Sequence, residues 1–214
     1  MALEVFDYRT DVRNVVIIPE IRARFIRMQP GQTNVPHSHD LGHEVFLVLE
    51  GEVEFEIAGQ RAVLSPGQMC VAYRDELHAI RCVSDAPATY YISVTPHVEP
   101  THTRWDAHGA KLPPAYGTAA RDEREHNDPS AGKSTDQLGD EHVASATALA
   151  EAAEQSAGVQ TSGASRVKAA LATGDADGAK RAVDEMWESM YRTSRALREL
   201  ETAWNEFSAR FSVA

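Results

Sequence analysis

Short apolar runs alternate with turn residues at close intervals through the first 97 residues. Eight runs have the length and the β-branched content of strands. They are Asn14–Ile18, Ile21–Met28, Glu44–Glu50, Glu52–Ile57, Arg61–Leu64, Gln68–Tyr73, His78–Val83 and Thr89–Thr95. The turns between several of them carry Gly or Pro-Gly. Many short strands at this spacing predict an antiparallel sandwich or barrel.

The composition changes near residue 97. Residues 1–97 hold 19 Val and Ile with 8 Ala, whereas residues 98–214 hold 6 Val, no Ile and 24 Ala. β-Branched residues suit a pleated sheet, and Ala has the highest helix propensity. We therefore expect a mainly β domain at 1–97, a loop or linker at 98–139, and an α-helical extension at 140–214.

The extension is expected to hold two short helices and one long helix. The short ones are Asp140–Ala157 and Ser165–Ala172, and Asp175 or Asp177 can cap the long one. Apolar residues recur every seven positions along the long helix: Val183, Met190, Leu197, Trp204 and Phe211. The companion positions are Met186, Leu200 and Phe207, with Thr193 as the polar exception. This pattern fits either packing on the rest of the chain or self-association as a coiled coil.

Net charge and cysteine content narrow the class of protein. Of 214 residues, 21 are Lys or Arg and 32 are Asp or Glu, so the formal net charge is −11. An acidic chain repels a phosphate backbone, so we expect no nucleic-acid partner. No apolar run approaches 18 residues, and the start has no signal-peptide core, so we expect neither a membrane span nor export. Two cysteines, Cys70 and Cys82, fit a reducing cytoplasm.

The segment from Gly31 to Gly51 carries the clearest chemistry. His37 and His39 are two residues apart, so on an extended chain both imidazoles leave the same face. A short loop then brings Glu44 back beside them at the start of a strand. Two neutral imidazoles and a carboxylate suit a divalent transition metal.

The same residues resemble the cupin family. Gly31, His37, His39, Glu44 and Gly51 match its first motif, G(x)5HxH(x)3–4E(x)6G, at every position. Of its second motif, G(x)5PxG(x)2H(x)3N, Gly67 and His78 are present. Tyr73 replaces the proline, Asp75 the glycine and Cys82 the asparagine. The departures fall mainly in the turn before His78.

The resemblance covers about residues 15–96 and implies a small double-stranded β-helix, or jelly roll, with one metal inside. His37, His39, Glu44 and His78 would be its ligands, and the ion would be Fe(II), Mn(II), Ni(II), Co(II) or Zn(II). Four protein ligands on an octahedral ion leave two positions for water, O₂ or a chelating substrate.

Residues near this motif have further candidate roles. Tyr73 and Asp75 precede His78 and could line the pocket mouth as a catalytic hydrogen-bond donor and a general base, although a plain loop is an equal alternative for Asp75. His43 is expected to point away from the metal, because it precedes Glu44 on the strand. His97, His102 and His108 match no ligand spacing, and their segment is expected to cross the barrel surface with Trp105 as its anchor.

Three functions fit these features. The first is a metal-dependent oxygenase acting on a small organic molecule, although the same ligand set also serves isomerases and lyases. The second is a non-catalytic sensor or binding module for a small molecule. The third makes the helical tail the functional, interacting part on a dimerising barrel. In each case we expect a homo-oligomer, most simply a homodimer.

Overall fold

The computed structural model describes residues 3–118 and 130–211, and its first part is built from eight strands. They are β1 Asn14–Ile18, β2 Ile21–Met28, β3 His43–Glu50, β4 Val53–Ile57, β5 Gln60–Leu64, β6 Met69–Ala72, β7 His78–Cys82 and β8 Ala88–Thr95. Each expected strand is present, and its ends lie within one residue of the prediction.

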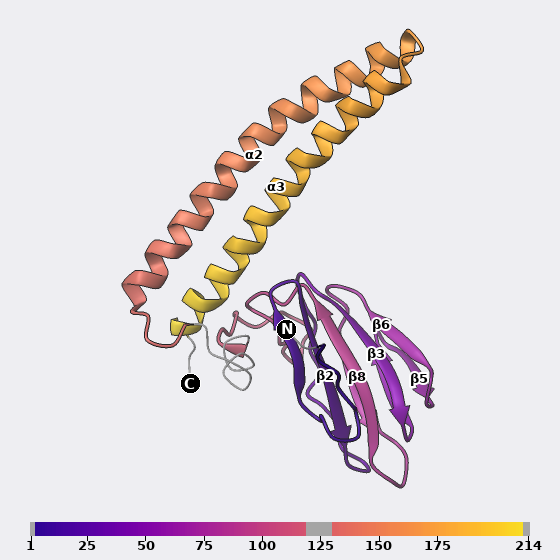
Figure 1. Ribbon diagram of the computed structural model, residues 1–214. Helices are drawn as coiled ribbons and strands as arrows, with labels where there is room; N and C mark the ends of the chain where they lie inside the picture. The colour runs from indigo at the N-terminus through magenta and orange to yellow at the C-terminus, as the bar shows by residue number, and fades with distance from the viewer. Residues whose placement is uncertain (1–2, 119–129, 212–214) are drawn as a thin grey trace. The chain divides into compact units, whose positions relative to one another are not determined.

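The strands form two antiparallel sheets (Figure 1). One has the order β1-β2-β8-β3-β6 and the other β5-β4-β7. Alternate side chains of both sheets point inward and form one apolar core, which includes Phe46, Phe55, Ile80 and Tyr90. Burying a side chain as large as Phe46 contributes about 1.5–3 kcal/mol. The expected jelly roll followed by helices is confirmed.

A glycine is required where β3 turns into β4. Gly51 has a φ of +72°, and a Cβ there would lie 2.9 Å from the Cα and the Cβ of Ala88. Any larger residue would be strained by its backbone and would also push β8 away. The motif glycine therefore lets β3, which carries Glu44, pair closely with β8.

The second part is a pair of long helices, α2 at Thr135–Ala172 and α3 at Ala176–Ser208, which lie side by side in Figure 1. A short 3₁₀ helix, η1 at Ala209–Phe211, follows. Ser134 and Gln137 form a capping box at the start of α2. Asp175, one of the two expected caps, accepts a hydrogen bond from the backbone N–H of Gly178 at 2.8 Å.

The expectation of two short helices before α3 is wrong, because α2 is continuous. Gly158 and Gly163 lie in the expected gap between the two short helices, but a glycine inside a helix costs only about 1 kcal/mol. At Gly163 the absence of a side chain is required by packing, because a Cβ there would lie 2.5 Å from the Cγ of Met186 on α3. The glycine lets the two helices approach closely.

The expected linker is shorter than 98–139 within the described residues. Thr103 pairs with Ser38 and Trp105 with Lys111 as isolated bridges, and α2 already begins at Thr135. Residues 119–129 of that segment lie outside the described residues. The chain divides into two compact units, Met1–Ala131 with Ser208–Ala214, and Gly132–Phe207. Across the described residues, no helix is both long enough and apolar enough to span a membrane.

Candidate metal centre

Four side chains from separate stretches of the first unit meet inside the jelly roll. His37, His39, Glu44 and His78 each offer one ligand atom, and these atoms all lie within 4.8 Å of one another. Oε2 of Glu44 lies 3.2 Å from Nε2 of His39 and 2.8 Å from Nε2 of His78. All four residues are buried, His37 most exposed at 8%. The four residues expected from the sequence are thus brought together.

The sheet register explains this meeting. Glu44 on β3 pairs with Ala72 on β6, and His78 opens β7 opposite Ile57 on β4. His37 lies outside the named strands, but it exchanges both backbone hydrogen bonds with His78, at 3.1 and 2.9 Å. This bridge places the His37–His39 segment against β7.

A backbone carbonyl orients each of the three imidazoles. Nδ1 of His37 lies 2.9 Å from the carbonyl oxygen of Val35, and Nδ1 of His78 lies 2.9 Å from that of Glu76. Nδ1 of His39 contacts the carbonyl oxygen of Thr101. A carbonyl only accepts, so each Nδ1 carries a proton, which leaves Nε2 as the ring nitrogen that can bind a metal. Such outer partners are typical of metal-ligating histidines.

The charges of the cluster also suit a cation. Although burial alone would raise the pKa of Glu44, the contacts with His39 and His78 hold that pKa well below its usual value. Burial, with the charge of His78, lowers the pKa of His37 to about 4. At neutral pH this gives a carboxylate beside a neutral imidazole, the protonation states that metal binding requires.

The surroundings of Nε2 of His78 test whether these residues fit a metal. Nε2 of His78 is buried, and among the described residues none gives it a hydrogen bond of acceptable geometry, although Oε2 of Glu44 is 2.8 Å away. Although burial alone would lower the pKa of His78, the carboxylate of Glu44 raises it above its usual value, so a positive charge between these two atoms is favoured. A divalent cation between them would satisfy both, so the donor set fits a metal.

A buried arginine that the sequence pattern did not single out completes the site. Arg22 on β2 is 5% exposed, and its Nη2 lies 3.9 Å from Oε1 of Glu44. The guanidinium lies near Oε1 of Glu44, whereas His39 and His78 contact Oε2. Its positive charge stabilises the carboxylate. Arg22 and Arg24 alternate with apolar residues along β2, as polar residues do on an ordinary solvent-facing strand. The sequence therefore does not mark Arg22 as part of a site.

The chain after β8 forms part of the site. We name residues 97–111 the strap; within it His97, Thr101 and Thr103 are buried. Trp105 Nε1 donates to Oγ of Ser38 at 2.9 Å, so Trp105 anchors the strap as expected. The expectation of a purely surface segment is wrong, because the strap supplies the carbonyl that orients His39.

The strap also brings a fourth histidine to the cluster. The ring centroid of His102 lies 4.8 Å from that of His37 and 5.1 Å from that of His39. Burial lowers the pKa of His102 far below its ordinary value, so the ring stays neutral. Sequence spacing does not reveal this, because His102 reaches the cluster only when the chain returns across residues 37–39.

Tyr73 and Asp75 lie at the outer rim. Tyr73 is 60% exposed and its ring contacts the ring of His43, with centroids 5.6 Å apart. Asp75 has a φ of +65°, so it adopts the left-handed conformation at the position where the family motif has glycine. Its backbone N–H donates to the carbonyl of His39 at 2.8 Å. Lys111 bridges the carboxylates of Asp75 and Asp40, each at 2.8 Å.

Other expected neighbours lie where the strand pattern places them. His43 is exposed, and its Nδ1 accepts from the backbone N–H of Arg74 at 3.1 Å. Phe46 and Val48 are fully buried on the same face of β3 as Glu44. The ring of Phe46 lies 5.9 Å from that of His78, so it forms apolar wall beside the site.

A cleft of about 310 Å³ opens between the edge strands β5 and β6. Phe55, Ile57 and Leu64 are among its apolar lining residues, and Tyr73, Arg61 and Glu76 are among its polar ones. Cys70 belongs to this lining and pairs with Phe46 across β6 and β3. Burial and the charge of Glu44 raise the pKa of the Cys70 thiol to about 11, so the thiol stays protonated.

Parts of this chain are similar to known proteins. Residues 24–95 match the Cupin domain family. A conserved Klebsiella pneumoniae protein with a double-stranded β-helix domain is 21% identical, with 44% of this chain and 91% of that one covered and a TM-score of 0.42. A protein from Thermus thermophilus is 24% identical over 44% of this chain and 98% of that one, with a TM-score of 0.40. KdgF from Halomonas sp. is 24% identical over 39% and 77%, with a TM-score of 0.37. None of the curated proteins compared with this chain matches it.

Proposed function

Residues 24–95 match the Cupin domain family, and from that premise we propose that this chain is a mononuclear metal-dependent oxygenase of a small organic molecule. One observation supports this most: three histidines and Glu44 converge with their ligand atoms within 4.8 Å of one another. The proposed ligands are His37, His39, Glu44 and His78, and the proposed ion is Fe(II), Mn(II), Ni(II), Co(II) or Zn(II).

A divalent transition metal bound there would supply Lewis-acid chemistry, and with iron or manganese also redox chemistry. The residues around it have separable tasks. Glu44 contributes the negative charge, and the carbonyls of Val35, Thr101 and Glu76 hold the imidazoles in the ligating orientation. Phe46 and Val48 exclude water from one side of the site. The cleft between β5 and β6 offers an apolar surface for the body of a substrate.

Tyr73 and Asp75 remain the proposed groups for hydrogen bonding and proton transfer. Support comes from the backbone contact of Asp75 with His39, which couples that loop to a ligand. The ammonium of Lys111 contacts the Asp75 carboxylate at 2.8 Å.

The oxygenase proposal is tested by anaerobic reconstitution with Fe(II), Mn(II) or Ni(II), followed by O₂ uptake across phenolic, thiol and diketone compounds. We expect metal-dependent O₂ uptake with at least one class. His37→Ala should abolish the uptake, and His43→Ala, at an exposed neighbouring histidine, should retain it. Stoichiometric metal binding without turnover of any compound would contradict the proposal.

The second candidate is a binding or sensor module that holds a small molecule unchanged. The exposed position of Tyr73 and the pairing of Asp75 with Lys111 favour it, because neither is a buried general base. In that case a ligand should raise the melting temperature of the metal-loaded protein without being consumed. Under both functions we propose that the chain forms a homodimer in which the helical extension takes part.

A further inference from the structure

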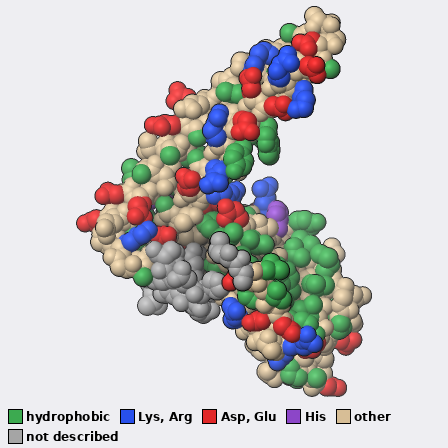
Figure 2. Space-filling view, in the orientation of Figure 1, with side chains coloured by type: hydrophobic (Ala, Val, Ile, Leu, Met, Phe, Trp, Pro, Cys, Tyr) green, Lys and Arg blue, Asp and Glu red, His purple; other side chains and the backbone are tan. Residues whose placement is uncertain are grey.

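Helix α3 carries an exposed apolar stripe that the fold of its own unit does not use. Val183, Trp187, Met190 and Tyr191 are 50%, 61%, 54% and 48% exposed. Their spacing of four, three and one residues puts them on one side of the helix. Hydrophobic side chains gather along the middle of the helical pair in Figure 2. We call these four residues the α3 stripe.

A different side of α3 packs against α2. Ala179, Ala182 and Ser189 are buried there. The side-chain amide of Gln160 on α2 donates to the carbonyl of Met186 at 2.9 Å, and Thr193 Oγ1 lies 3.3 Å from the carbonyl of Ala152. Small residues and hydrogen bonds therefore hold the helical pair together, while the larger side chains of the stripe face outward.

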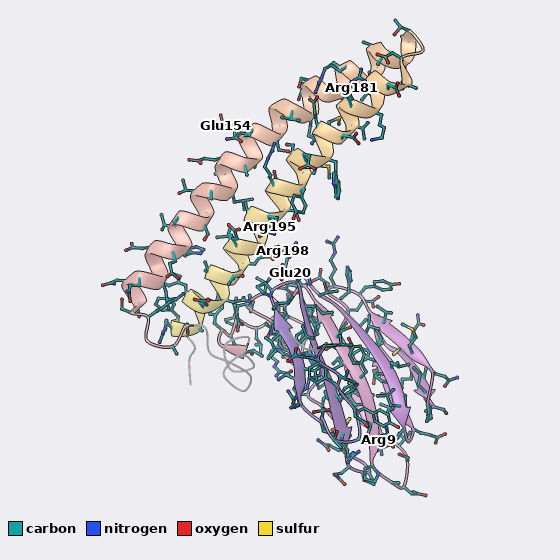
Figure 3. All side chains as sticks on the ribbon, in the orientation of Figure 1. Arg9, Glu20, Glu154, Arg181, Arg195 and Arg198 are labelled. Atoms are coloured by element: carbon teal, nitrogen blue, oxygen red, sulfur yellow. The ribbon has the colours of Figure 1, made fainter. Side chains whose placement is uncertain are left out.

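The charges beside the stripe are segregated along the helix. Three acidic residues precede Met190: Asp184, Glu185 and Glu188. Three arginines follow it: Arg192, Arg195 and Arg198. Figure 3 labels Arg195 and Arg198 on α3. No residue of opposite sign interrupts either group between positions 184 and 198.

Several of these charges have local partners on the surface. Asp184 pairs with Lys180 and Glu185 with Arg166, and all four side chains are 48% exposed or more. Exposed ion pairs of this kind contribute little and exchange partners readily. Arg198 pairs with Glu201 on α3 itself, with side chains 33% and 13% exposed. These local pairs do not change the order of acidic residues and arginines along α3, which is what a second helix would meet.

We propose that α3 pairs antiparallel with α3 of a second copy of this chain, across a two-fold axis near Met190. This inference rests on the proposed homodimer and names its surface. In the antiparallel arrangement the acidic group of each copy faces the arginines of the other, and both stripes are buried between them. A parallel arrangement would put acid against acid and arginine against arginine.

The paired segment has a suitable extent. From Asp184 to Arg198 it spans about 21 Å of helix at 1.5 Å per residue. Two helical pairs joined through α3 make a four-helix arrangement, in which the large side chains of the stripe occupy the centre. Isologous contact needs only one surface, because the same residues serve both copies.

The test is the mass of the full-length protein in solution, measured by light scattering and sedimentation. The chain of 23.5 kDa should be a dimer. The acidic-group variant Asp184→Lys/Glu185→Lys/Glu188→Lys and the arginine-group variant Arg192→Glu/Arg195→Glu/Arg198→Glu should each be monomeric. An equimolar mixture of the two should form heterodimers, because opposite charges then face each other again. The dimer dissociation constant of either variant should rise at least 100-fold.

Matched controls separate charge reversal from misfolding. Glu151→Lys/Glu154→Lys, on exposed positions of α2, should remain dimeric. Helical circular dichroism and bound metal should be unchanged in all variants. Trp187→Ser/Met190→Ser should weaken the dimer without any change of charge.

Each remaining outcome overturns a distinct claim. If both charge variants stay dimeric, another surface carries the dimer and the α3 pairing is wrong, while the homodimer stands. If each is monomeric but the mixture is too, the antiparallel arrangement is wrong. A monomeric wild-type chain overturns both the homodimer and its surface. None of these results alters metal content, so the metal proposal is tested separately.

Discussion

At the scale of single residues, the candidate site depends on where protons reside. The carbonyl contacts of His37, His39 and His78 place the proton on Nδ1 and leave Nε2 for a metal. Glu44 is anionic because its histidine contacts outweigh its burial. Glu44 and His37 are thus already in the protonation states of a metal complex, whereas His78, whose pKa Glu44 raises against the effect of burial, gives up its proton when a metal binds.

Removal of a ligand should reduce metal affinity more than removal of any outer partner. We expect His37→Ala and His78→Ala each to weaken binding by more than about 100-fold, beyond the range for outer partners. Metal content by elemental analysis and affinity by calorimetry measure this. His43→Ala, on an exposed side chain, is the control and should bind as the wild type does. Equal affinity in His78→Ala would mean that this residue is not a ligand.

A second residue-scale prediction concerns His97. Burial, with the charge of Arg22, lowers the pKa of His97 from 6.5 to about 3. Between those values the unfolded chain binds a proton that the folded chain does not. The free energy of unfolding therefore falls as pH falls from 6.5 towards 3, by up to about 1.4 kcal/mol per pH unit from this group.

His97→Gln should flatten that slope. Urea unfolding of the metal-free protein at pH 7 and pH 5 gives the two free energies. His37, with a pKa lowered to about 4, acts in the same direction in both proteins and cancels in the comparison. His108→Gln, at an exposed histidine, should leave the slope as it is. An unchanged slope in His97→Gln would show that His97 does not lose its proton on folding.

At the scale of elements, the strap acts as a brace for the metal-binding segment. Trp105 holds Ser38, the residue between His37 and His39, and Lys111 bridges Asp40 to Asp75. The bridge itself is exposed and contributes at most about 1 kcal/mol to stability. The hydrogen bond from Trp105 to Ser38, a fully buried residue, matters more for the geometry of the segment.

Trp105→Ala should therefore weaken metal binding about tenfold, the lower end of the range for outer partners. The sheet content by circular dichroism should not change, because no residue of β1–β8 contributes to this bond. Leu112→Ala, at a 46% exposed position just after the strap, is the control. Wild-type affinity in Trp105→Ala would show that the strap covers the site without bracing it.

The two glycines of α2 allow a paired prediction. A Cβ at Gly158 would meet nothing within 4 Å, so Gly158→Ala should stabilise the helical unit by about 1 kcal/mol through helix propensity. A Cβ at Gly163 would meet Met186 at 2.5 Å, so Gly163→Ala should give a clearly smaller gain or a loss. Urea unfolding followed at 222 nm measures both, and equal gains would contradict the close approach of α3.

At the scale of the whole molecule, the division into two compact units separates metal effects from helix effects. A ligand that binds only the folded form at 100 times its dissociation constant stabilises it by about 2.7 kcal/mol. Removal of metal with a chelator should lower the melting temperature of the β unit by roughly 5–15 °C. The helical transition should stay where it is.

Differential scanning calorimetry with circular dichroism distinguishes the two transitions. His37→Ala should show no response to the chelator, because its site no longer holds the ion tightly. A chelator effect on the helical transition alone would place the metal outside the four-residue cluster.

Local pattern was sufficient for the strands and for three of the four residues of the candidate cluster. Turn residues and β-branched runs mark all eight strands, since these preferences act within a few residues. The spacing of His37, His39 and Glu44 is equally local, and His78 followed from a resemblance that preserved its position. The heptad on α3 includes Val183 and Met190 of the exposed stripe, whereas Trp187 and Tyr191 lie outside it.

Only the tertiary structure decided what distant segments do for one another. Gly158 and Gly163 weaken a helix locally, yet packing against α3 keeps α2 continuous, because tertiary contacts outweigh about 1 kcal/mol of propensity. Arg22 and His102 reach the cluster through sheet register and the return of the strap, over separations no local pattern encodes. The sequence was sufficient to identify the candidate donor residues, whereas the groups that orient and surround them could be identified only from the fold.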